Sequence, residues 1–127
     1  MHLQHQIRKG STPVLILSLL AEQPMYGYQI TRELERRSEG YFTMKEGLLY
    51  PALHQMERDG LLRSEWRTVA GARRRKYYFI TEKGRKVLAN SVAEWTTFTE
   101  KLMQVIGGHG HVEPEFIPCL LYTSDAA

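Results

Sequence analysis

The order of helical, strand-like and turn patterns along the chain limits its possible folds most strongly. Apolar residues recur three or four positions apart in three consecutive segments, which predicts three helices. These segments are residues 14–21, 26–38 and 44–59. Two strand-like runs, residues 62–69 and 76–80, then flank Ala70-Gly71-Ala72, as in a β-hairpin. We therefore expect a mainly α fold with a small two-stranded β wing, which is a winged helix-turn-helix.

Prolines and glycines set the expected helix ends. Ser11 or Thr12 can cap the first helix, with Pro13 in its first turn, where a missing N–H costs nothing. Gly60 provides a stop for the third helix. Pro51 lies inside the third helical pattern and should kink or tighten it.

A long helix with one apolar seam is expected at residues 82–106, with Thr81 as its N-cap. Its apolar positions alternate by four and three, close to a heptad pattern. One hairpin cannot cover so long a stripe, so a second copy of the chain is the simplest partner. The expected dimer-interface residues are Leu88, Val92, Trp95, Thr99, Leu102 and Ile106.

Composition restricts the class of protein. The chain has 127 residues and is 43% hydrophobic, which suits one domain with one modest core. Its single cysteine, Cys119, excludes an intrachain disulfide and a cysteine-rich zinc site. No apolar run reaches the roughly 18 residues of a membrane span, so we expect a cytoplasmic protein without a membrane partner. We predict no cofactor.

Three parts of the chain are expected. Residues 1–81 form the winged helix-turn-helix, residues 82–106 the dimerisation helix, and residues 107–127 a flexible tail. The tail contains His109, His111, Glu113 and Glu115, but its Gly- and Pro-rich sequence offers no scaffold, so we predict no metal site. Residues 119–127 read CLLYTSDAA, the translation of a transposon-end adapter used in sequencing libraries. We expect them to be non-native.

Candidate DNA-contacting residues lie in the third helix, because the later helix of a helix-turn-helix enters the major groove. Its first turns carry Lys45, Glu46, Gly47, Tyr50 and His54. Lys45 can pair with a phosphate or guanine, Gly47 can allow close approach of DNA, and Tyr50 can donate to a phosphate. Equally, Gly47 can suit a kinked helix start and Tyr50 can pack in the core.

The net charge of +3 is mild, but Arg73, Arg74, Arg75 and Lys76 form one run of cations. We place this run at the tip of the hairpin, where it would raise DNA affinity by releasing counterions. A solvated charged turn is the alternative.

Trp95 lies on the seam of the last helix. It is either a tryptophan of the dimer core or a flat surface on which a planar ligand stacks. Phe98 and Trp66 are weaker candidates for the second role.

Three stretches carry a resemblance to a known family. They read TPVLILSLLAEQPMYGYQITREL, EGLLYPALHQMERDGLL and RRRKYYFITEKG. These stretches resemble the PadR family of bacterial transcriptional regulators, in the branch with a single C-terminal dimerisation helix. The resemblance covers about residues 10–102. It implies DNA contacts by Lys45, Gly47, Tyr50, Pro51 and the cations of residues 73–76. Leu48 replaces a small hydroxyl residue that is common in the family, which suggests an apolar contact to a thymine methyl.

The resemblance also implies a function. Family members typically repress genes for detoxification, efflux or phenolic-acid handling, and some bind planar aromatic molecules near a tryptophan placed like Trp95. We therefore expect a homodimeric repressor that reads a pseudo-palindromic operator and is relieved by a small aromatic effector. The alternatives are a winged-helix module for protein–protein contact and a small enzyme using the His/Glu tail. The sequence holds no G-x-S-x-G, P-loop or H-E-x-x-H motif, and we do not expect an enzyme.

Overall fold

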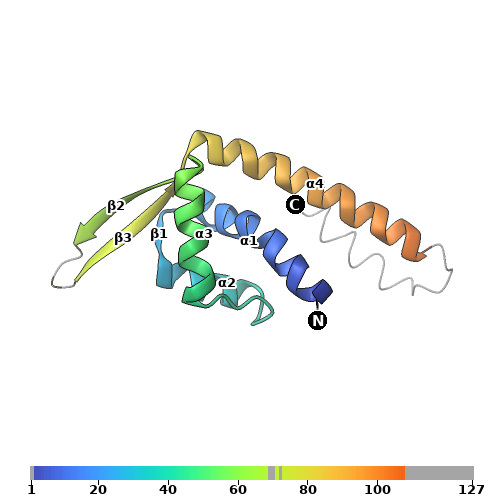
Figure 1. Cartoon of the computed structure of the whole chain (residues 1–127), viewed down its shortest axis with the longest axis horizontal. Helices are drawn as coiled ribbons and strands as arrows, with labels where there is room; N and C mark the ends of the chain where they lie inside the picture. Colours follow the sequence, from blue (N-terminus) through green and yellow to red (C-terminus); the bar gives the residue numbers. More distant parts are fainter. Residues whose placement is uncertain (1, 69–70, 72, 108–127) are drawn as a thin grey trace. The chain divides into compact units, whose positions relative to one another are not determined.

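The computed structural model describes residues 2–68, 71 and 73–107, with the backbone alone for residues 2–9. Its elements are α1 (His2–Glu22), β1 (Met25–Tyr26), α2 (Gly27–Arg37), α3 (Glu46–Arg58), β2 (Leu62–Thr68), β3 (Arg74–Ile80) and α4 (Glu82–Gly107) (Figure 1). The chain forms two compact units, Met1–Ala89 and Asn90–Ala127, and α4 contributes to both. The predicted class, helices with a small wing and a long last helix, is confirmed.

The core of the first unit is formed by apolar residues three or four positions apart on three helices, as the periodicity predicts. Each helix buries one stripe, and the sheet adds Met25, Leu62 and Tyr78 beneath them. The buried helical residues are Ile16, Leu17, Leu19, Leu20, Ile30, Leu34, Leu49, Leu53 and Met56. Close packing of these side chains fixes α2 and α3 against each other and against α1.

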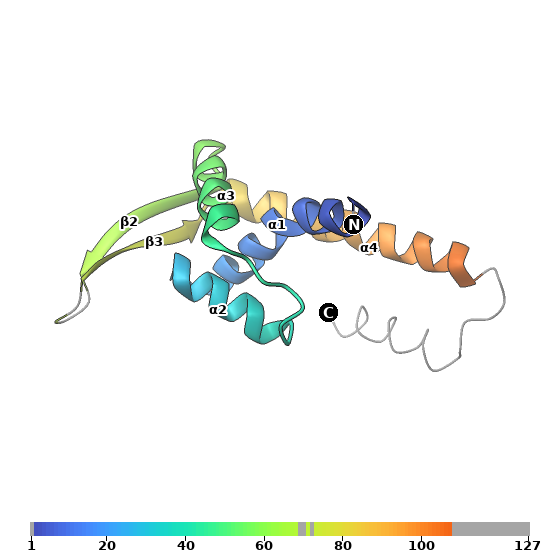
Figure 2. The ribbon, with the colours of Figure 1, turned by 60° about the horizontal axis from the view of Figure 1, so that its bottom comes forward.

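The sheet has three antiparallel strands in the order β1-β3-β2, one more than the sequence predicted. The additional strand β1 pairs Met25 with Tyr78 and Tyr26 with Tyr77. A two-residue strand is too short to produce an alternating pattern, so sequence periodicity could not reveal it. β2 and β3, which we call the wing, pair from Leu62–Ile80 to Thr68–Arg74 and extend away from the helices of this unit (Figure 2).

The predicted start of the first helix is wrong. α1 begins at His2, so Ser11 and Thr12 do not cap it, and Pro13 lies in its interior. A helix can continue through a proline at the cost of one backbone hydrogen bond, and burial of Ile16 and Leu17 on the next turn offsets that cost. Pro51 likewise lies inside α3 without ending it.

The predicted C-terminal stop of α3 and the predicted start of α4 are confirmed, whereas α3 begins at Glu46, two residues later than predicted. Gly60 follows Asp59, the C-cap residue of α3, and has φ +81°, a conformation that glycine adopts without strain. The Thr81 hydroxyl accepts a 3.0 Å hydrogen bond from the Gly84 N–H and donates one of 2.6 Å to the Gly60 carbonyl. A Cβ atom at Gly84 would overlap the Leu61 carbonyl, so the first turn of α4 lies close against the chain. No helix in the described ranges is long and apolar enough to cross a membrane.

Candidate nucleic-acid interface

The outer face of α3 presents the residues that the sequence singled out. Leu49, Leu53 and Met56 point into the core, which leaves the intervening positions to solvent. The exposed predicted residues are Lys45, Glu46, Gly47, Leu48, Tyr50, Pro51 and His54. Lys45 is the N-cap residue and Glu46 the first residue of the helix, so this face begins at the helix start, where base contacts are made in helix-turn-helix proteins.

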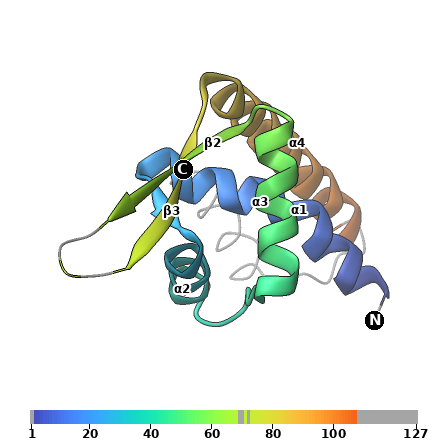
Figure 3. The ribbon, with the colours of Figure 1, turned by 60° about the vertical axis from the view of Figure 1, so that its left-hand side comes forward.

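One face of the wing lies next to this helix. Trp66, Arg74, Lys76 and Tyr78 alternate with residues of the opposite face, as the strand register requires. Together with Tyr50 and His54 of α3 they line a hollow of about 380 Å³. Figure 3 shows α3, the wing and α2 around this region. The two elements predicted to contact DNA are therefore brought together on one side of the molecule.

The four cations of the run do not share one environment. β3 begins at Arg74, so the prediction that the whole run lies at the hairpin tip is wrong for three of them, and only Arg73 precedes the strand. Arg73 and Arg74 are exposed, and the Arg74 guanidinium lies 5.2 Å from the Trp66 ring centre. Because residues of a strand alternate in direction, the next two cations meet different partners.

Arg75 and Lys76 are already engaged within the chain. Arg75 Nη1 donates a 2.8 Å hydrogen bond to the Tyr26 hydroxyl. Lys76 Nζ lies 3.9 Å from a carboxylate oxygen of Glu57, whose other oxygen accepts a 2.6 Å hydrogen bond from the Ser64 hydroxyl. Arg73 and Arg74 are thus the cations of the run most accessible to an anionic partner.

The position of Tyr50 is compatible with both roles that the sequence left open. Its side chain is 36% exposed and borders the hollow, yet its ring rests on Gly27 at the start of α2. A Cβ atom at Gly27 would lie 2.8 Å from Tyr50 Cζ, so the ring requires glycine there. Gly47 differs, since nothing lies within 4 Å of a Cβ built on it. Packing within the described part of the chain does not demand glycine at position 47.

Tyr26 and Tyr78 were missed by the sequence reasoning. Tyr26 borders the hollow and holds Arg75, a position that depends on the unpredicted strand β1. Tyr78 is buried beside Glu57, and burial, aided by the charge of Glu57, raises the pKa of its hydroxyl. Neither residue stands in a pattern that sequence alone could separate from an ordinary core aromatic.

A second candidate surface lies on α4 within the second unit. Five large apolar side chains on it are at least 41% exposed, namely Val92, Phe98, Leu102, Val105 and Ile106. Thr99 is also exposed, and Trp95 is half-buried. Trp95 and Phe98 meet edge to face at 5.8 Å between ring centres and, with Glu94, line a hollow of about 250 Å³. Leu88 belongs to the first unit, where it packs partly against the core of its own chain.

The predicted tail falls outside the described residues. This applies to His109, His111, Glu113 and Glu115, and to the region 119–127 that we expect to be non-native. Within the described ranges, no group of three or more His, Cys, Asp or Glu side chains could hold a metal ion.

The fold, with the outer face of α3 beside the wing, defines a winged helix-turn-helix protein. Residues 16–90 match the family described as the transcriptional regulator PadR-like family. A transcriptional regulator of Mycobacterium tuberculosis is 34% identical over 106 residues, which cover 84% of this chain and 92% of the relative. The chain therefore belongs to the PadR-like family of transcriptional regulators.

Solved structures agree with this assignment. A PadR family transcriptional regulator from Eggerthella lenta has 31% identity and a TM-score of 0.72, over 83% of this chain and 89% of its own. The structure of Bacillus subtilis PadR in complex with operator DNA has a TM-score of 0.59 and 22% identity, over 64% of this chain and 45% of its own. The second likeness is one of fold alone.

Proposed function

We propose that this protein is a sequence-specific DNA-binding repressor that acts as a homodimer. The observation that carries the proposal is the hollow between α3 and the wing, where Tyr50 and His54 face Trp66 and Arg74. A groove-reading helix beside a cationic wing is the arrangement in which base and phosphate contacts form together. The shared fold of Bacillus subtilis PadR, solved with operator DNA, supports the same interpretation.

Different residues would perform the two tasks. Lys45, Arg73 and Arg74 are exposed cations suited to phosphates, which fix the register of the protein on the duplex. Glu46, Leu48 and His54 on the outer face of α3 would contact base edges, with Leu48 against a thymine methyl. Gly47 and Pro51 would allow the DNA to approach this face closely. Arg75 and Lys76 would act mainly through their partners Tyr26 and Glu57.

The dimer would form through α4. The exposed apolar side chains from Val92 to Ile106 are too many for a solvated helix, and burying them against a second copy is favourable by about 25 cal/mol per Å². We propose Val92, Trp95, Thr99, Leu102 and Ile106 as the interface, with Leu88 at its edge. Two α3 helices about one DNA turn apart would then read a pseudo-palindromic operator.

An effector would bind on α4. Trp95 and Phe98 offer two aromatic faces beside a small hollow, which suits a planar aromatic molecule. Binding there would change the spacing of the two α3 helices and so relieve repression.

The test is a titration of the full chain against two labelled duplexes, the DNA upstream of its own gene and a shuffled duplex of equal composition. We expect tighter binding to the upstream DNA, with sedimentation giving a dimer that Leu102→Asp dissociates. Absence of binding to either duplex at low salt would refute the proposal and leave a protein–protein interaction module in its place.

A further inference from the structure

α2 carries three arginines, and they are not equivalent. Arg36 forms a 2.8 Å ion pair with Glu33. Arg37 pairs with both Glu33 and Glu22, at 2.8 and 2.6 Å. Arg32 forms no ion pair within 4 Å with any residue in the described ranges, and Glu35 acts on it only at longer range.

Arg32 is instead held by Tyr28. Its Nη1 donates a 2.7 Å hydrogen bond to the Tyr28 hydroxyl, and its guanidinium carbon lies 5.5 Å from the centre of the same ring. Tyr28 is 59% exposed, so neither side chain is placed there by burial. An exposed tyrosine and an arginine one helical turn apart hold each other in a defined position.

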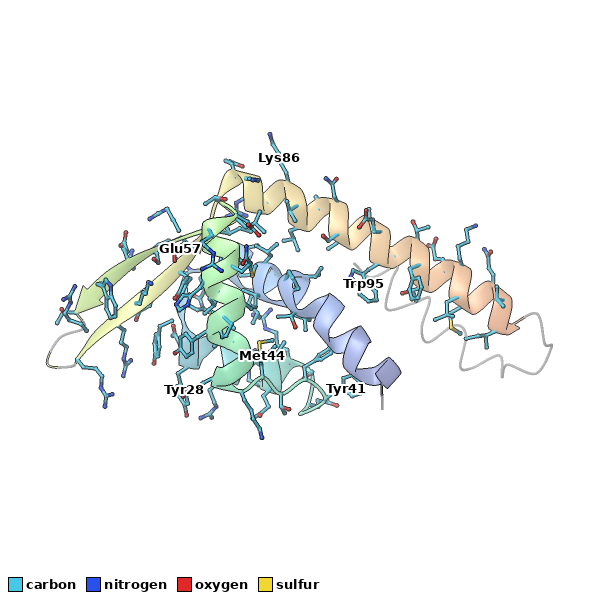
Figure 4. The ribbon with its side chains drawn as sticks, in the orientation of Figure 1. Tyr28, Tyr41, Met44, Glu57, Lys86 and Trp95 are labelled. Atoms are coloured by element: carbon cyan, nitrogen blue, oxygen red, sulfur yellow. The ribbon has the colours of Figure 1, made fainter. Side chains whose placement is uncertain are left out.

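The pair lies next to the proposed DNA-binding surface. Tyr26, which borders the hollow between α3 and the wing, also borders a second hollow of about 630 Å³ whose lining includes Tyr28 and Arg32. Figure 4 shows Tyr28 towards the end of α3 near Met44, with Glu57 towards its other end. The hollow that the pair lines also reaches Thr43, two residues before Lys45, the N-cap residue of α3.

We propose that Tyr28 and Arg32 form a phosphate-binding pair that anchors α2 to the DNA backbone beside the groove read by α3. This inference rests on the proposed DNA binding. The first helix of a helix-turn-helix crosses the backbone, and these two side chains supply the donors it needs. Because the Tyr28 hydroxyl accepts from Arg32, its own proton is left to donate to a phosphate oxygen. The guanidinium keeps further N–H groups for the same phosphate.

The experiment compares Arg32→Ala with Arg36→Ala in duplex titrations of the full chain at several salt concentrations. Both changes remove one charge from the same helix, so the second variant controls for net charge. Each lost phosphate contact flattens the slope of log K against log salt by about 0.9. With two copies in the dimer, Arg32→Ala should flatten it by about 2 and weaken binding about tenfold or more at 0.1 M salt.

Two further variants distinguish the loss of a phosphate contact from a loss of folded structure. Tyr28→Phe keeps the ring but removes the donor, and it should weaken binding to upstream and shuffled DNA alike. Arg32→Lys should keep most of the salt slope but only part of the affinity, because the lysine ammonium cannot form the bidentate hydrogen bonds of a planar guanidinium. Unfolding midpoints should stay near that of the unsubstituted protein in all four variants.

The outcomes are distinct. If the unsubstituted protein binds with a steep salt slope but Arg32→Ala matches Arg36→Ala, the phosphate-binding pair is refuted while the proposed function stands. If the unsubstituted protein binds no duplex, both fail. A selective loss in Arg32→Ala and Tyr28→Phe supports the pair.

Discussion

The guanidinium of Arg75 lies over the ring of Tyr26, 4.4 Å from its centre, while Nη1 donates a hydrogen bond to the hydroxyl of the same residue. Tyr26 is the N-cap residue of α2 and also a residue of β1. This contact therefore joins the wing directly to the helix-turn-helix. It explains why a cation in the middle of a basic run is turned back towards the protein.

Arg74 and Arg75 should consequently behave differently when each is replaced by alanine. Arg74→Ala removes an exposed cation, so we expect weaker DNA binding, a flatter salt slope and little change in unfolding free energy. Arg75→Ala removes a hydrogen bond and a ring contact, so we expect a loss of about 1 to 2 kcal/mol in stability. Denaturant unfolding and duplex titration of both variants provide the check. Identical behaviour of the two would contradict the assigned environments.

Gly27→Ala tests the contact between α2 and α3. The new methyl group would overlap the Tyr50 ring, so the variant should lose about 1 to 3 kcal/mol of stability. In the background of Tyr50→Ala the overlap is absent, and the same change should gain up to about 1 kcal/mol from helix propensity. The four proteins form a double-mutant cycle measured by urea unfolding. An equal change in unfolding free energy in both backgrounds would mean that positions 27 and 50 do not interact.

Leu48 and Leu53 provide a matched pair on one helix. Leu53 is fully buried and Leu48 is 45% exposed. Leu53→Ala should cost about 2 to 5 kcal/mol of stability, whereas Leu48→Ala should stay within about 0.5 kcal/mol yet reduce the preference for upstream over shuffled DNA. A Leu48→Ala variant with unchanged sequence preference would remove Leu48 from the base-reading set.

Stability should fall in acid partly through Glu33. Hydrogen bonds from Arg36 and Arg37 lower the pKa of Glu33 from 4.5 to about 2. A carboxylate with a depressed pKa stabilises the fold above its unfolded pKa, and that contribution is lost as pH falls from about 4.5 towards 2. The loss should be shallow because Arg36 and Arg37 are exposed, so solvent screens their interaction with Glu33.

Glu33→Gln should flatten the pH dependence of unfolding free energy across that interval. Glu35→Gln is the control, since Glu35 forms no ion pair within the described part of the chain. A curve for Glu33→Gln that parallels that of the unsubstituted protein would show that these arginines do not stabilise the charged form.

Sequence reasoning predicted the outer face of α3 well because helical periodicity separates Leu49, Leu53 and Met56 from the exposed positions between them. It also predicted the hairpin and the long helix α4, which are local patterns. It failed where a feature depends on distant partners. The strand β1 is too short to show a period, and its pairing with β3 is what places Tyr26 under Arg75.

The prediction of where α1 begins failed for a different reason. Pro13 after Ser11 and Thr12 has the local chemistry of a helix start, but in this chain the proline lies in the interior of the helix. The differences among Arg73, Arg74, Arg75 and Lys76 were also hidden, because strand alternation and the positions of Tyr26 and Glu57 separate them only in three dimensions.

The central claim, that α3 and the wing bind DNA, is tested most directly by the salt dependence of duplex binding in an Arg73→Ala plus Arg74→Ala variant. Arg85→Ala plus Lys86→Ala is the matched control, with the same charge change on exposed positions of α4. Two arginines in each of two wings predict a slope of log K against log salt flatter by about 3 to 4 in the wing variant, with the control unchanged. Equal slopes in the unsubstituted protein, the wing variant and the control would contradict the account.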